Sequence, residues 1–236
     1  MKGLRGAIVV TGTDTGVGKT VVTAAIAAAA SVAGLTVAVV KPCQTGVDTG
    51  EETDADVVAR LAAPDYVTTL ERYPDPLAPT IAARIAGLPA VSLNLVVDTM
   101  HTLMAAHDLV LIEGAGGVLV PLGRDDWTVI ELAAALQAPA VVVARPGLGT
   151  LNHTALTRLA LARRGVPDLL VLGEWPAEPE LVHRTNLRAL PPLSGAIPAG
   201  AGQLPQETFR GQCSEWLSPQ LHGVLDVNVF TISNRR

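Results

Sequence analysis

Short runs of aliphatic and β-branched residues alternate along this chain with longer, alanine-rich segments. Several runs, such as 109–112 and 140–143, are apolar at every position, which is typical of strands in a parallel sheet covered by helices on both faces. The predicted strands lie near 7–11, 36–41, 108–113, 139–145, 167–173 and 193–197. The predicted helices cover 19–33, 54–62, 78–86, 92–106, 128–137, 150–164 and 179–189. The pattern therefore predicts an α/β fold with a mostly parallel sheet.

Glycine- and proline-rich stretches at 42–53, 114–127 and 191–205 fall where strand-end loops are expected. Ligands of parallel sheets collect at the carboxyl ends of the strands, so we interpret these stretches as site loops and not as domain linkers. The 236 residues suit one domain, 1–236, with a full-sized core. Residues 218–236 have no clear period, and no element is assigned to that tail.

Composition and charge narrow the classes of partner. The net charge of −5 gives no electrostatic case for nucleic acid or an anionic membrane. Residues 20–40 carry no charge, but Ser31 and Gly34 interrupt them, and a helix followed by a strand explains the stretch better than a membrane span. Cys43 and Cys213 are too few for a disulfide framework and do not have metal-ligand spacing.

The first residues run directly into the strand at 7–11 and leave no room for a signal peptide. We therefore expect a soluble, cytoplasmic protein.

Residues 12–20, Gly-Thr-Asp-Thr-Gly-Val-Gly-Lys-Thr, form a glycine-rich loop between a strand and a helix. Such a loop turns backbone N–H groups toward one point, where the helix dipole also favours an anion. Lys19 would reach the β- and γ-phosphates of a nucleotide, and the Thr20 hydroxyl would bind the accompanying Mg²⁺. Thr13 stands where the strict pattern has glycine, with Gly12 one residue earlier. The motif predicts nucleotide binding and a P-loop NTPase-like sheet.

Lys41 ends the predicted strand 36–41 and is followed by Pro42. Proline biases the residue before it toward an extended conformation, so we expect the amine to point out of the end of the sheet. A second ammonium beside Lys19 would neutralise charge that develops on a transferred phosphoryl group.

Two acidic positions are candidate Mg²⁺ ligands. Asp54, with Asp56, opens a predicted helix, where either Thr53 or Asp54 could be the N-cap; the sequence leaves capping and Mg²⁺ ligation open. Glu113 follows a buried strand directly and leads into small residues, the place where P-loop enzymes hold Mg²⁺ or its water.

A further helix begins within residues 148–154, Leu-Gly-Thr-Leu-Asn-His-Thr. Free N–H groups at a helix start form a ready site for a carboxylate or a phosphate. His153 is interpreted as a structural histidine of that helix start.

Four motifs occur together in this chain: the loop at 12–20, Lys-Pro-Cys-Gln-Thr-Gly at 41–46, Ile-Glu-Gly-Ala-Gly-Gly at 112–117 and Gly-Thr-Leu-Asn-His at 149–153. In order and spacing they closely resemble the dethiobiotin synthetases over residues 6–200. The resemblance implies an ATP- and Mg²⁺-dependent ligase that carboxylates 7,8-diaminononanoate with CO₂ and closes the ureido ring of dethiobiotin, with release of ADP and phosphate.

The resemblance also implies roles for residues. Lys41, Lys19 and Thr15 would be catalytic, Thr45 would bind substrate, and the helix start would receive the substrate carboxylate across a homodimer interface. That helix start comprises Gly149, Thr150, Leu151 and Asn152. Thr20, Asp54 and Glu113 would bind Mg²⁺. The implied nucleotide contacts are Gly16, Val17, Gly18, Lys19, Thr20, Val21, Asp54, Glu113, Gly114, Ala115, Gly116, Gly173, Glu174, Pro198, Ala199 and Gly200.

Two positions depart from the family pattern. Gly173-Glu174 replaces the Asn-Asp pair of members that read adenine, so the preferred nucleoside triphosphate stays open. Gly16 replaces a larger residue seen in some relatives.

Three other classes share part of this pattern. A cobyrinate-type amide synthetase would need a second, glutamine-hydrolysing domain, for which the chain after residue 200 is too short. A partitioning or positioning ATPase would have lysine at Asp14, and its membrane-bound members would end in a basic amphipathic helix. A small-molecule kinase would have an arginine-rich lid.

Overall fold

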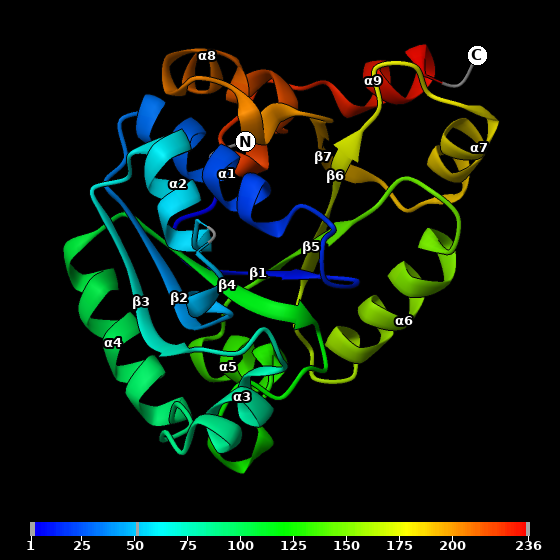
Figure 1. Cartoon of the computed structure of the whole chain (residues 1–236). Helices are drawn as coiled ribbons and strands as arrows, with labels where there is room; N and C mark the ends of the chain where they lie inside the picture. Colours follow the sequence, from blue (N-terminus) through cyan, green and yellow to red (C-terminus); the bar gives the residue numbers. More distant parts are fainter. Residues whose placement is uncertain (1–2, 51, 235–236) are drawn as a thin grey trace.

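The computed structural model describes residues 3–50 and 52–234, which form a single parallel sheet between layers of helices (Figure 1). The strand order is β3-β2-β4-β1-β5-β6-β7, and every pairing between neighbouring strands is parallel. The strands are β1 Gly6–Gly12, β2 Val37–Thr45, β3 Tyr66–Tyr73, β4 Leu109–Gly117, β5 Ala140–Ala144, β6 Asp168–Trp175 and β7 Leu193–Pro198. The predicted α/β class is confirmed.

The predicted helices are present, with ends shifted by a few residues. The helices are α1 Lys19–Val32, α2 Asp54–Ala62, α3 Pro79–Ala86, α4 Leu93–Ala106, α5 Val129–Leu136, α6 Thr150–Ala162, α7 Leu181–Ala189, α8 Gln206–Gln212 and α9 Val227–Ser233. Helix α5 begins with a capping box, in which the side chains of Thr128 and Glu131 satisfy each other's main-chain N–H groups.

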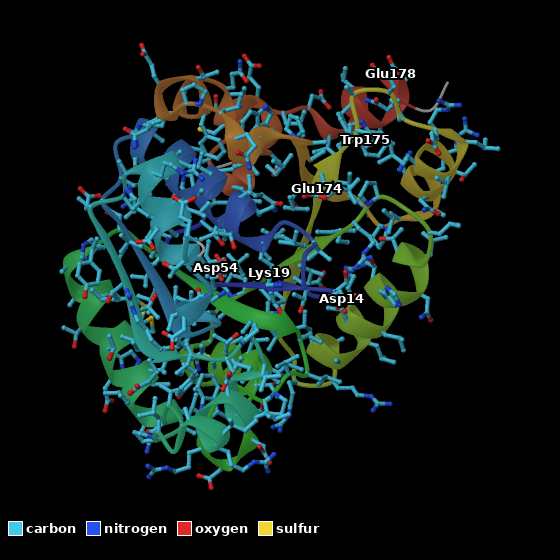
Figure 2. The ribbon with its side chains drawn as sticks, in the orientation of Figure 1. Asp14, Lys19, Asp54, Glu174, Trp175 and Glu178 are labelled. Atoms are coloured by element: carbon cyan, nitrogen blue, oxygen red, sulfur yellow. The ribbon has the colours of Figure 1, made fainter. Side chains whose placement is uncertain are left out.

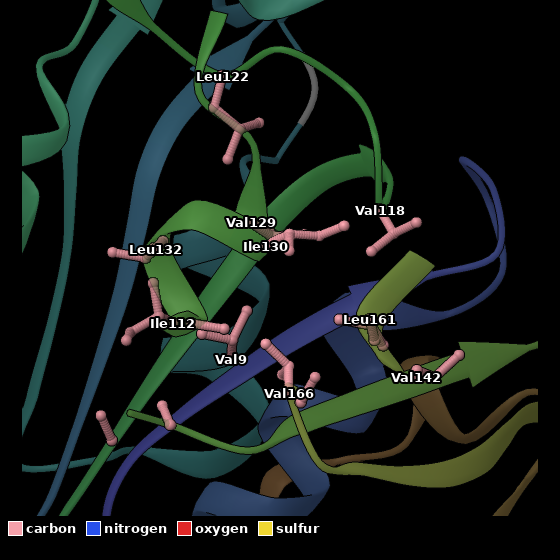
Figure 3. Packing of buried hydrophobic residues seen from close by; sticks show 14 of the residues in the cluster. Val9, Ile112, Val118, Leu122, Val129, Ile130, Leu132, Val142, Leu161 and Val166 are labelled. Carbon is pink, nitrogen blue, oxygen red and sulfur yellow. The ribbon is translucent and has the colours of Figure 1, made fainter. Parts of the chain in front are cut away.

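Alternate residues of β1 divide the core into two halves. Ile8 and Val10 pack on the face covered by α1, α2 and the segment around α8. Val9 packs on the opposite face, beneath α3 to α7, where Ile112, Val142 and Leu161 meet it (Figure 3). Burial on both faces explains why the central strands are apolar at every position.

Strand β3 has no counterpart among the predicted strands. It lies at the edge of the sheet, paired only with β2, and its sequence Tyr-Val-Thr-Thr-Leu-Glu-Arg-Tyr is mostly half-buried. An edge strand with one neighbour keeps polar side chains, and the continuous apolar run that marks a central strand is then missing.

Two predicted loop regions begin inside strands. β2 continues to Thr45 and β4 continues to Gly117, so the predicted loops at 42–53 and 114–127 start later than expected. β2 pairs with β4 only as far as Val40 and Ile112, and beyond that point β2 stays with β3 alone. The two strands therefore separate, and Lys41 and Glu113 are the first residues of the opening.

The tail that the sequence could not place contains a 3₁₀ turn at Pro219–Leu221 and helix α9. Phe230 of α9 packs on the core and stacks edge-to-face against Trp175 at the end of β6. Within residues 3–50 and 52–234, no helix is long and apolar enough to cross a membrane.

Candidate active site

The phosphate loop joins β1 to α1 at the carboxyl edge of the sheet. Gly18 takes a left-handed conformation with φ of 90°, which lets the chain turn directly into α1 without a side-chain cap. Lys19 is 7% exposed, and its Nζ donates to the carbonyl oxygen of Asp14 at 2.9 Å. Burial and the neighbouring Lys41 ammonium lower the pKa of Lys19. The loop thus holds the Lys19 ammonium group against its own backbone.

Lys41 lies in the middle of β2 and is 5% exposed. Its Nζ is 2.5 Å from Asp54 Oδ2 and 3.0 Å from Glu113 Oε1, and it donates to the carbonyl oxygen of Gly114. Burial alone would lower the pKa of Lys41, but the two carboxylates outweigh it and raise that pKa above the ordinary lysine value. Lys41 therefore stays an ammonium group at any pH the protein would experience.

The predicted end of the strand at Lys41 was wrong, because β2 continues to Thr45. The amine of Lys41 crosses the gap between β2 and β4 to the two carboxylates and lies near the Lys19 ammonium group. The reason is that Pro42 does not stop β2: Lys41 and Cys43 on either side of it keep their register with β3.

Three oxygen-bearing side chains converge beside the two lysines. Thr20 Oγ1 is 2.9 Å from Asp54 Oδ1 and 2.8 Å from Glu113 Oε1. The single hydroxyl proton of Thr20 satisfies one carboxylate at a time. The described residues contain no group of three or more His, Cys, Asp and Glu side chains placed to hold a metal ion. A hydroxyl and two carboxylates nevertheless make an all-oxygen set, the donor chemistry that Mg²⁺ prefers.

The cap of α2 is Thr53, which answers the question that the sequence left open for Asp54. Thr53 and Asp56 form a reciprocal capping box, so the Asp54 carboxylate is not needed as a cap. The Asp54 main-chain N–H donates to Gln44 Oε1 at 3.2 Å, and its carboxylate turns toward Lys41 and Thr20. Burial opposes the charge on Asp54, but Lys41 outweighs burial and lowers the pKa of Asp54.

A cavity of about 930 Å³ contains this cluster. Lys19 and Asp54 lie near one another beside the start of α1, and Glu174 lies above them (Figure 2). The predicted site residues that line the cavity are Thr15, Gly16, Gly18, Lys19, Thr20, Val21, Lys41, Thr45, Asp54, Glu113, Ala115, Gly116 and Glu174.

Several predicted nucleotide contacts do not line the cavity. Val17 is buried, and Gly114 faces Lys41 through its carbonyl oxygen. Gly173 is packed so closely that a Cβ there would lie 1.8 Å from the Val17 carbonyl oxygen. The end of β7, Pro198, Ala199 and Gly200, also lies outside the lining.

The helix start at 149–152 also lies outside the lining of the cavity of this chain. Thr150 is buried, and its N–H donates to Gly147, so its side chain faces the protein interior. Leu151 and Asn152 are exposed. Within one chain, this helix start therefore does not contribute to the cavity that holds the lysine–carboxylate cluster.

Sequence reasoning missed several residues that line the cavity. Gln44 lies inside the motif at 41–46, but nothing in its pattern predicted its bond to the start of α2. Glu52 and Arg60 form an exposed ion pair at the rim, with Arg60 Nε 2.8 Å from Glu52 Oε1. Gly202 and Gln203 come from the turn after β7, two and three residues beyond the last predicted contact, Gly200.

These features define the class of protein: a P-loop nucleotide-binding α/β protein with a second, buried lysine between two carboxylates. A family model described as an AAA domain matches residues 6–201. The chain is 54% identical over 215 residues to the ATP-dependent dethiobiotin synthetase BioD of Rhodococcus jostii, covering 89% of this chain and 93% of that protein. It is 52% identical over 231 residues to the protein of the same name from Streptomyces avermitilis, covering 94% and 96%.

The chain belongs to the ATP-dependent dethiobiotin synthetase family and is a ligase. Among solved structures it is similar to the septum site-determining protein MinD of Pyrococcus horikoshii with Mg-ADP, with a TM-score of 0.56, 18% identity and 97% coverage of both chains. The cell-division ATPase MinD of Pyrococcus furiosus gives 0.53 and 19%, with 89% and 98% covered. At these identities the likeness shows the fold alone.

Proposed function

We propose that this protein converts 7,8-diaminononanoate, CO₂ and a nucleoside triphosphate into dethiobiotin, a nucleoside diphosphate and phosphate. The observation that carries the proposal is Lys41, held between Asp54 and Glu113 beside Lys19 and Thr20. This places two ammonium groups and an oxygen-rich ligand set at one end of the sheet. Such an arrangement suits the transfer of a phosphoryl group onto a small anion.

In the proposed reaction, one amine of the substrate attacks the carbon of CO₂ and loses a proton, giving a carbamate. A carbamate oxygen then attacks the γ-phosphorus, and the bond from that phosphorus to the bridging oxygen breaks as the diphosphate leaves. The second amine attacks the carbonyl carbon of the mixed anhydride. Phosphate leaves, the amine loses a proton, and the ureido ring is closed.

Lys19 and the backbone of the loop would hold the β- and γ-phosphates, and the Thr15 hydroxyl would bond the same oxygens. Lys41 keeps its proton because of its two carboxylate partners. Its role would therefore be to stabilise the negative charge of the carbamate and of the transferring phosphoryl group, not to transfer a proton. Thr45 lines the cavity at the end of β2, where it would contact the diamine.

Mg²⁺ would be held by Thr20, Asp54 and Glu113. The donor set fits, because the Thr20 hydroxyl oxygen lies 2.9 Å from an Asp54 oxygen and 2.8 Å from a Glu113 oxygen, and all three groups are oxygen ligands. The ion would neutralise phosphate charge. Against the effect of burial, the Lys41 ammonium group lowers the pKa of Asp54, which favours the charged carboxylate that would bind the ion.

A homodimer would complete the substrate site. Leu151 and Asn152 begin α6 with exposed side chains that do not reach the cavity of their own chain. Their main-chain N–H groups have no hydrogen-bond partner among residues 3–50 and 52–234. A second copy could place this helix start over the cavity, where the N–H groups would bind the substrate carboxylate.

The proposal is tested by supplying ¹³C-bicarbonate, Mg-ATP and the diamine, and analysing the product by mass spectrometry. The expected product is dethiobiotin one mass unit heavier, because the ring carbonyl comes from CO₂. The Lys19→Ala variant should give none. Labelled bicarbonate that is consumed without entering dethiobiotin would contradict the proposed chemistry.

A further inference from the structure

Asp14 places a carboxylate inside the phosphate loop. Its Oδ1 accepts the N–H of Thr15 at 2.8 Å, and its carbonyl oxygen accepts Lys19 Nζ at 2.9 Å. Asp14 therefore holds the loop through two contacts, one from its side chain and one from its main chain. Its negative charge, however, lies beside the place where the nucleotide phosphates would bind, and like charges repel. None of the steps proposed above uses that charge.

Arg145 supplies the opposite charge. Its Nη2 is 2.9 Å from Asp14 Oδ2, although the two residues are 131 positions apart in the chain. Arg145 follows the last residue of β5, and the same edge is joined to the loop by a bond from the Thr13 N–H to the Val143 carbonyl oxygen. The ion pair thus closes a contact between the phosphate loop and the end of β5.

The chain after Arg145 is fixed as well. Asn186 of α7 is buried, and its Nδ2 donates to the carbonyl oxygens of Pro146 and Gly147 at 3.0 and 2.9 Å. With β5 before it and Asn186 behind it, Arg145 is held close to Asp14. The Nε of Arg145 is buried without a hydrogen-bond partner in the described part of the chain, so its ion pair with Asp14 is the polar contact that orients the guanidinium.

We propose that Arg145 is a positioning residue for nucleotide binding: it cancels the charge of the Asp14 carboxylate and holds that carboxylate on the Thr15 N–H. This rests on the nucleotide site proposed above. The ion pair is half-exposed, with side-chain exposures of 42% and 54%, so its electrostatic effect is of moderate size and decreases with salt.

The test is a calorimetric titration with ATP and MgCl₂, without diamine or bicarbonate, at low and high KCl. Arg145→Gln should weaken ATP binding about fivefold at low salt, because it leaves Asp14 unpaired. Asp14→Asn should tighten binding about threefold, because it keeps the acceptor for Thr15 and frees a positive charge. The double variant should lie within about twofold of the wild type, and high salt should reduce all three differences.

Two controls separate this effect from others. Arg163→Gln removes the same charge from an exposed residue at the far end of α6 and should leave ATP affinity unchanged. Arg145→Lys keeps the charge and should bind nearly as the wild type does.

Wild-type affinity in Arg145→Gln, or a double variant as weak as Arg145→Gln, would overturn the proposal. If Arg145→Gln does not fold, the sign of the Asp14→Asn effect decides, and weaker binding by that variant overturns it. A wild-type protein that binds no nucleotide would instead contradict the nucleotide site itself.

Discussion

At the scale of single residues, Lys41 affects both the stability of the fold and the proposed chemistry of the site. It brings together two carboxylates that would otherwise repel each other, and it is almost fully buried while doing so. Breaking a buried ion pair by removing one partner costs more than the pair contributes, because the remaining charge stays buried without compensation. The stability of the fold and the proposed catalysis therefore depend on the same ammonium group. Measuring the two effects separately requires a single variant and a double variant.

Lys41→Met should lower turnover by about 10²–10³-fold, the loss typical of one oriented charge-stabilising group. It should also lower the free energy of unfolding by about 3 kcal/mol, because Asp54 and Glu113 are left facing each other. Lys41→Met/Glu113→Gln should recover most of that stability in urea unfolding and none of the turnover. Recovery of turnover by the double variant would remove Lys41 from the chemistry.

The lowered pKa of Asp54 predicts an acid dependence of stability. A carboxylate whose folded-state pKa lies below its unfolded value, about 3.9, contributes stability that is present above that pH and is lost as pH falls through the folded value. Urea unfolding of the wild type and of Asp54→Asn should therefore differ most near pH 6 and converge below about pH 4. A difference that is constant from pH 6 to pH 3 would contradict this assignment.

The sequence singled out Lys19, Thr20, Lys41, Asp54 and Glu113 because its pattern placed each at a predicted strand end or helix start. It could not decide the orientation of Lys41 or the cap of α2. The orientation of Lys41 depends on its contact with Glu113, which is far away in the chain, whereas the α2 cap depends on which of two neighbouring residues, Thr53 or Asp54, turns its side chain toward the helix start. The local sequence pattern predicts the strand to which Lys41 belongs. The direction of its side chain is determined by Glu113, which lies 72 positions away in the chain.

At the scale of elements, β6 supports the phosphate loop by direct backbone contact. A Cβ at Gly173 would lie 1.8 Å from the Val17 carbonyl oxygen, and a Cβ at Gly18 would lie 3.1 Å from the Gly173 carbonyl oxygen. Loop and strand therefore approach more closely than any side chain permits. A residue larger than glycine at 173, asparagine included, would therefore require a shifted loop.

Gly173→Ala should lower the free energy of unfolding by about 1–3 kcal/mol, because the added methyl group overpacks the contact. Its affinity for ATP should fall at least tenfold, since the loop must move. Gly211→Ala, with open space around the added Cβ, is the matched control and should match the wild type in both urea unfolding and ATP titration. Unchanged ATP affinity in Gly173→Ala would mean that β6 does not set the loop.

The elements that could be predicted are those buried on both faces or clearly capped. The central strands are buried on both faces, and α2, α4 and α5 begin with side-chain caps, whereas edge strand β3 and helix α8 have neither signal. Helix α9 has no buried residue of its own and is held mainly by Phe230 against the core. Tertiary contact, not local periodicity, determines such a short segment.

At the scale of the whole molecule, the proposed homodimer requires that α6 packs against a second copy of the chain. Leu156 and Leu159 lie on α6, exposed by 57% and 52%, on the helix whose start would reach the partner's cavity. A helix that packs against a second copy needs an apolar outer surface. Leu156→Glu should give a monomer in sedimentation velocity, retain ATP affinity and lose diamine-dependent turnover. An active monomer would contradict the shared substrate site.

We propose that phosphoryl transfer at this site is coupled to closure of the ureido ring. The test is to measure phosphate release with Mg-ATP and bicarbonate, with and without 7,8-diaminononanoate, together with the amount of dethiobiotin formed. We expect phosphate only when the diamine is present, with one dethiobiotin formed for each phosphate. Hydrolysis of ATP that proceeds equally without the diamine and yields no dethiobiotin would contradict it.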